Sequence, residues 1–245
     1  MKRQVTGKAI AAVVVSLAIP AAMGSTIVLN VDPVNFSSTS GGEFNAQVTG
    51  SLGGQTPAQI LGGYAAVAKT VVNSQTGFQT FCLEESESFT PGKSYNVAIN
   101  DRAVSGGANA SHPGVTPGAD ILSVGTTWLY SQFAQGTLAG YNYTLGAGRV
   151  ASAHELQATL WYLEDETTVA PANAFMTAVY GNFADPKLDA AAGLNGVHAL
   201  NVTLRDGALR QDVLIYTAPD GGLTVTLLGF GLATMGVLGL RVKKN

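Results

Sequence analysis

The chain has 245 residues, of which 46% are hydrophobic and only 12% are charged, about half the charged fraction of an average soluble domain. Six of its 13 Lys and Arg residues lie in the first eight or last five positions, so the segment between them carries 7 basic residues against all 16 acidic ones. This acidic balance argues against a nucleic-acid-binding protein, which needs a basic face. The single Cys excludes an intrachain disulfide framework and a Cys-rich zinc site.

The first 24 residues have the pattern of a secretory signal peptide. Three basic residues within the first eight positions precede the apolar run 9–19, and small residues follow up to Gly24. A basic lead, a short apolar core and a small-residue cleavage site define such peptides. We therefore expect residues 1–24 to form a signal helix that is removed on export. An uncleaved anchor is the alternative, for which the apolar run is short.

The C-terminus predicts a second membrane segment. Residues 218–245 comprise a short Pro-Asp-Gly-Gly motif, the uncharged and mostly apolar run 223–240, and a basic tip. Eighteen such residues suffice for a marginal transmembrane helix. The terminal basic residues favour a cytoplasmic end for this helix.

This tripartite tail resembles the PEP-CTERM group of bacterial sorting signals, in the variant with a Val-Pro-Asp-Ser/Gly-Gly lead. Pro219, Asp220, Gly221 and Gly222 match that variant, and Ala218 stands where it usually has Val. The resemblance implies that an exosortase-type enzyme processes the tail during export. It also implies a Gram-negative-type bacterium with an exopolysaccharide or biofilm matrix. The protein would be membrane-tethered during sorting and then reach the cell surface or extracellular matrix; an ordinary membrane anchor is the alternative.

Between the two ends lies an exported ectodomain, residues 25–217, in which alternating apolar and polar residues recur. This pattern is typical of strands. The segments that show it are 26–31, 44–49, 78–84, 94–100, 197–204 and 212–217. We expect 78–84 and 94–100 to pair as a hairpin across the Pro91-Gly92 turn. The segment 60–72 is apolar without a clear period, so strand and helix both stay open there.

Apolar residues at helical spacing follow in the second half of the ectodomain. The segments that show this spacing are 121–133, 153–166 and 173–180. Ser152 and Glu155 predict a capping box at the start of the second segment. The sequence therefore predicts an α+β fold: a mainly antiparallel β ectodomain with inserted helices, an N-terminal signal helix and a C-terminal transmembrane helix.

Cys82 is the residue with the most chemical interest. A lone Cys in an exported domain indicates either a reactive thiol or an intermolecular bond. The alternative is a small buried core residue, because free Cys is among the most buried residue types. Gln157 lies at the border of the apolar stripe of the expected helix 153–166 and could point inward.

The surroundings of these two residues resemble the thioester domains of Gram-positive surface adhesins. Those domains have an aromatic-Cys-apolar motif on a strand and an apolar-Gln-x-x-apolar-apolar motif on a helix. The matching residues are Phe81, Cys82, Leu83, Leu156, Gln157, Leu160 and Trp161. The resemblance covers about a third of the chain. It implies that Cys82 and Gln157 form an internal thioester with loss of ammonia, which would then acylate an amine or hydroxyl on a partner.

Two acidic clusters complete the candidate sites. Glu84, Glu85 and Glu87 follow the Cys, and residues 164–166 end the expected helix. Carboxylate pairs can hydrolyse glycosidic bonds, but three acids at a helix C-terminus oppose its dipole and favour a solvated patch or a cation site. No calcium-binding loop or His spacing for a metal is present. We expect no cofactor, no metal and no enzymatic activity.

Together these features predict an exported surface or matrix protein that attaches covalently through the thioester, to a surface amine or hydroxyl or to exopolysaccharide. The alternative is a non-covalent structural or adhesive biofilm-matrix protein in which Cys82 is a core residue.

Overall fold

The computed structural model confirms the α+β class with mainly antiparallel strands. It describes residues 25–31, 37–38, 41–104 and 120–218. The expected signal peptide at 1–24, the sorting motif at 219–222 and the apolar run 223–240 lie outside these residues. Within the described part, none of the helices combines the length and the hydrophobicity needed to cross a bilayer.

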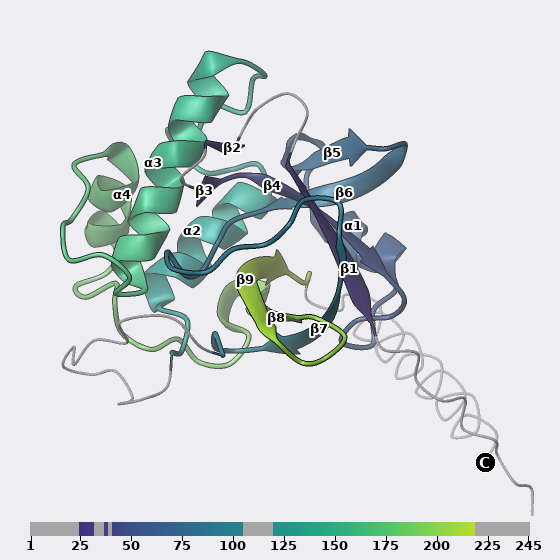
Figure 1. Cartoon of the computed structure of the whole chain (residues 1–245). Helices are drawn as coiled ribbons and strands as arrows, with labels where there is room; N and C mark the ends of the chain where they lie inside the picture. The colour runs from purple at the N-terminus through teal and green to yellow at the C-terminus, as the bar shows by residue number, and fades with distance from the viewer. Residues whose placement is uncertain (1–24, 32–36, 39–40, 105–119, 219–245) are drawn as a thin grey trace, which may run out of the picture.

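One antiparallel sheet forms the body of the described chain, with the strand order β5–β6–β4–β1–β7–β8–β9 (Figure 1). Its strands are β1 (Thr26–Val31), β4 (Phe44–Thr49), β5 (Lys69–Val72), β6 (Gln75–Thr80), β7 (Ser94–Asn100), β8 (Val197–Thr203) and β9 (Leu209–Tyr216). Two short strands, β2 (Ser37–Ser38) and β3 (Gly41–Gly42), pair separately. The predicted bounds of β1, β4 and β7 are confirmed.

The sheet curls so that residues 81–83, which follow β6, lie against the last strand β9 and form a seam. Beyond the end of β6, the Leu83 N–H donates to the Asp212 carbonyl at 2.9 Å, and the Leu214 N–H donates to the Phe81 carbonyl at 3.2 Å. Cys82 lies between these two hydrogen bonds, opposite β9. The lone Cys therefore sits where segments distant in sequence close the sheet.

The expected hairpin between 78–84 and 94–100 is wrong. β6 ends at Thr80 and pairs with β4 and β5, whereas β7 pairs with β1 and β8. Both edges of β7 are thus occupied, and residues 81–83 continue to the seam instead. Alternation identified the strands, but it does not specify which strands pair.

Helices α2, α3 and α4 gather along one side of the sheet (Figure 1). The helices are α1 (Pro57–Gly63), α2 (Val124–Ala134), α3 (Ala147–Leu163) and α4 (Ala174–Asn182), with 3₁₀ turns η1 (Ala66–Ala68) and η2 (Leu194–Gly196). Side chains of Ser123 and Asn173 cap α2 and α4 by accepting a backbone N–H of the first turn. The open segment 60–72 divides between α1, η1 and β5.

Helix α3 begins earlier than the sequence predicted. Ser152 is not its N-cap: the helix starts at Ala147 after Gly146, and the Ser152 hydroxyl accepts the Asn142 N–H at 3.1 Å. The added first turn contains Arg149, whose side chain is buried. A buried Arg within a short run of small residues gives no helical period, so the hydrophobic pattern alone did not include this turn.

A buried ion pair fixes the start of α3 against the strand region. Arg149 Nη2 lies 2.6 Å from Glu43 Oε2, and its Nε donates to Glu43 Oε1 at 2.7 Å. Arg149 also donates to the carbonyls of Tyr143 and Val67, and the Tyr141 hydroxyl donates to Glu43. Because both charged groups are buried, each offsets the cost of removing the other's charge from water.

We expect Arg149→Met to lower the free energy of unfolding by about 3–5 kcal/mol, because it leaves the Glu43 carboxylate buried without its partner. Urea unfolding of the purified chain measures this loss. Arg205→Met, at an exposed position, should change the stability by less than about 0.5 kcal/mol. Equal losses in the two variants would show that the ion pair does not stabilise the fold.

Candidate functional site

The structure brings Cys82 and Gln157 together. The Gln157 side chain is fully buried, with 0% exposed. Its Nε2 donates to the Cys82 carbonyl at 2.8 Å, and its Oε1 accepts the Cys82 N–H at 3.0 Å. Gln157 therefore points inward, as expected, and its side-chain amide pairs with the backbone of Cys82.

A second backbone donor completes the surroundings of the Gln157 carbonyl. The Gly42 N–H donates to Gln157 Oε1 at 3.3 Å, beside the N–H of Cys82. Two N–H groups directed at one carbonyl oxygen withdraw electron density from its carbon. This is the arrangement that stabilises an oxyanion in acyl transfer.

Gly41 lies directly against the site and has no room for a side chain. Its φ is +93°, and a Cβ there would lie 2.5 Å from Gln157 Cγ and 2.8 Å from Trp161 Cη2. Only glycine fits such a close approach with a positive φ. Sequence reasoning missed Gly41 and Gly42 because they lie in a Ser- and Gly-rich stretch, where a functional glycine has the same pattern as a loop glycine.

The Cys82 thiol is held in its neutral form. The residue is 5% exposed and free of any disulfide. Burial raises the pKa of the thiol far above its usual value, and the Glu84 carboxyl raises it further. A thiolate is therefore scarce at neutral pH, so any reaction of Cys82 must move the thiol proton together with bond formation.

The supporting motif residues divide into two groups. Four lie in the hydrophobic core and fix the backbone on either side of the site: Phe81, Leu83, Leu156 and Leu160. Trp161 is only partly buried and lines a pocket beside the site. The candidate site thus has a rigid interior and one partly open side.

Only part of the acidic clusters is solvated, because Glu85 is exposed whereas Glu84 and Glu164 are buried. Glu84 is 1% exposed, and neither of its oxygens has a hydrogen-bond donor among the described residues. The neighbouring Glu87 carboxyl disfavours a negative charge on Glu84. Glu164 is also buried and accepts the Ser123 N–H. In the described ranges, no three His, Cys, Asp or Glu side chains are placed to hold a metal ion.

These carboxyls bind protons more tightly than usual because burial disfavours their charge. Burial raises the pKa of Glu84 to about 10 and that of Glu164 to about 7. It raises the pKa of Asp120, Glu166 and Asp212 to about 6 in each case. Mutual repulsion between neighbouring acids adds to the effect at most of these groups.

Comparison with known proteins finds no matching family model, no match among curated proteins and no similar solved structure. The resemblance to thioester domains stays a prediction, as does the resemblance of the tail to sorting signals. Inference about function accordingly depends on the geometry of the site.

We expect Glu84→Gln to stabilise the protein at neutral and alkaline pH. The unfolded chain releases the Glu84 proton above about pH 4.5, whereas the folded chain holds it to about pH 10. Stability of the natural chain therefore falls as pH rises through this window, by at most about 1.4 kcal/mol per pH unit for this proton. Urea unfolding at several pH values should show a shallower fall for the variant.

The control for this prediction is Glu155→Gln, which removes an exposed carboxyl on α3. Its stability should follow that of the natural chain at every pH. If Glu84→Gln keeps the full dependence of the natural chain on pH, the buried Glu84 proton is not its source.

We expect Gly41→Ala to destabilise the fold by at least about 2 kcal/mol more than Gly54→Ala. Both positions have a positive φ, so both substitutions strain the backbone, but only Gly41 faces atoms that a methyl group would displace. Nothing lies within 4 Å of a Cβ at Gly54. Thermal and urea unfolding measure the difference, and equal losses would show that the site does not need the close approach.

Proposed function

We propose that this chain is an exported bacterial surface or matrix protein that attaches covalently to a partner through a Cys82–Gln157 thioester. The observation that carries the proposal is the pairing of the buried Gln157 amide with the backbone of Cys82 through both its oxygen and its nitrogen. The side-chain amide is thereby held beside the residue that would attack it. Such fixed proximity removes much of the entropy that two separate groups would have to lose in order to react.

The bond changes balance without an outside reagent. The Cys82 sulfur bonds to the Gln157 side-chain carbon, and the carbon–nitrogen bond of the amide breaks. The thiol proton passes to the departing nitrogen, which leaves as ammonia. The N–H groups of Cys82 and Gly42 are placed on the oxygen that gains negative charge during this step.

The buried position explains why a thioester would survive here. A thioester is an activated acyl group that water hydrolyses, and a closed apolar site limits the access of water. The result is a single acylation of an amine or hydroxyl, without turnover.

The two ends of the sequence support the cellular part of the proposal. A signal peptide at 1–24 would direct export, and the tail 218–245 would hold the protein in the membrane until an exosortase-type enzyme processes it. The destination is the cell surface or extracellular matrix. A covalent attachment suits a protein that must stay bound to its partner outside the cell, where ATP-driven rebinding is absent.

One observation favours the second candidate, a non-covalent structural or adhesive matrix protein. The Gln157 amide satisfies both the N–H and the carbonyl of Cys82, as a buried polar group must if it is to avoid a desolvation penalty. In this alternative, Gln157 has the structural task of tying α3 to the seam and Cys82 is a core residue.

Intact mass spectrometry separates the two candidates. We expect the natural chain, purified in detergent, to be lighter by one ammonia than its sequence requires, and to gain one methylamine after incubation with that amine. Cys82→Ala and Gln157→Ala should show neither change, because each lacks one partner of the bond. Peptide mapping should place the added methylamine on Gln157.

An undiminished mass, with Cys82 alkylated only after unfolding, would contradict the thioester and leave the non-covalent candidate. Cys82→Ser serves as a further control, since it keeps the size of the side chain while removing the sulfur.

A further inference from the structure

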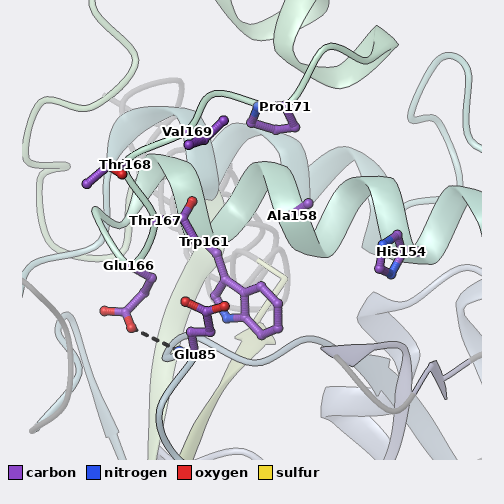
Figure 2. A pocket seen from close by; sticks show the side chains of 9 residues that line it. All are labelled: Glu85, His154, Ala158, Trp161, Glu166, Thr167, Thr168, Val169 and Pro171. Carbon is purple, nitrogen blue, oxygen red and sulfur yellow. Dashed lines mark hydrogen bonds between the residues drawn. The ribbon is translucent and has the colours of Figure 1, made fainter.

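A pocket of about 600 Å³ lies beside the Cys82–Gln157 site, on the exposed side of α3 (Figure 2). Trp161 forms its inner wall. Trp161 follows Gln157 by four residues on α3, so the pocket and the buried amide are one helical turn apart. Gly41 lies against both side chains. The residues that line the pocket are Glu85, His154, Ala158, Trp161, Glu166, Thr167, Thr168, Val169 and Pro171.

The charged groups of the pocket have one sign. Glu85 and Glu166 supply carboxylates on one side of Trp161 (Figure 2), and no Lys or Arg is among the described residues that line the pocket. Asp120 and Glu87 add negative charge close to Glu166. Burial and these neighbours raise the pKa of Glu166 to about 6, which leaves the group ionised at pH 7.

Two polar atoms of the pocket walls are buried without a partner among the described residues. Oε2 of Glu166 accepts the Glu85 N–H at 2.9 Å, but its Oε1 accepts nothing. The indole Nε1 of Trp161 likewise has no acceptor. Buried polar atoms of this kind are normally paired. A cation would supply a donor for Glu166 Oε1, although not an acceptor for the Trp161 N–H.

We infer that this pocket binds an organic cation, an ammonium or guanidinium group on an aliphatic stem such as the side chain of Lys or Arg. The carboxylates of Glu85 and Glu166 pair with the charge, and Trp161 offers the aromatic ring on which such cations rest. Ala158 and Val169 pack against the aliphatic stem. A guanidinium or ammonium is therefore a better fit than a neutral hydroxyl.

The pocket does not require the thioester in order to bind. If the proposed function holds, however, the pocket would place a positively charged segment of the partner one helical turn from Gln157. A basic polypeptide would then be a better partner than a neutral polysaccharide. This second step rests on the proposed function, whereas binding of the cation does not.

The test uses the full chain with Cys82→Ala, so that no thioester forms, and propylguanidinium as the probe. Its neutral relative propylurea has nearly the same shape and serves as the matched ligand. The chain has two Trp residues, so ¹⁵N-labelled protein gives two indole N–H signals, and Trp161→Phe identifies one of them. We expect propylguanidinium to shift the Trp161 signal in a saturable way, with at least tenfold weaker binding of propylurea.

Glu85→Gln together with Glu166→Gln should weaken propylguanidinium binding at least tenfold, while Glu155→Gln on α3 should leave it unchanged. If the double variant does not fold, Glu85→Gln alone changes only an exposed carboxyl and should weaken binding at least threefold. Equal shifts with both probes, a shift confined to Trp128, or full affinity in the Gln variants would overturn the inference. These outcomes are separate from the mass measurement on the natural chain, which tests the thioester.

Discussion

A primary amide without contact with water must find partners for its oxygen and nitrogen inside the protein, and the site of this molecule is arranged around that requirement. Gln157 has no exposed surface, so each unpaired atom would cost about 1–3 kcal/mol. The partners come from two other parts of the chain: the backbone of Cys82 at the seam, and the N–H of Gly42 in β3. One side chain thus ties helix, seam and short strand together.

The same helix holds the β3 region at a second point. Arg149 lies two turns before Gln157 on α3, and it pairs with Glu43, the residue that follows Gly42. Three consecutive residues of the strand region are therefore positioned by two buried polar contacts to one helix. Gly41 allows the close approach of the strand region to Gln157. Rigid placement by neighbouring groups of this kind distinguishes a prepared site from a chance meeting of two side chains.

Much of the fold followed from local pattern. The strands β1, β4 and β7 follow the alternating apolar and polar residues of their segments, and the helices α2 and α4 begin after side chains that cap them. The juxtaposition of Cys82 with Gln157 was also predicted, from the two motifs that contain them. The pairing of the strands was not predictable in this way. The alternating patterns of β6 and β7 are compatible with several neighbouring strands until the whole sheet is assembled. The buried turn at Arg149 and the role of Gly41 depend on contacts with residues about 100 positions away, which no local pattern encodes.

The seam has a mechanical consequence if, as proposed, the chain is tethered beyond Ala218. Any force applied beyond Ala218 enters the described fold through β9, whose two edges are held by β8 and by residues 81–83. The strand that receives this force is therefore hydrogen-bonded to the segment that contains Cys82. A pull between the proposed tether and a partner bound at Gln157 would therefore cross only a short stretch of the molecule, and the part of the core that packs around α2 and β8 would carry little of the tension.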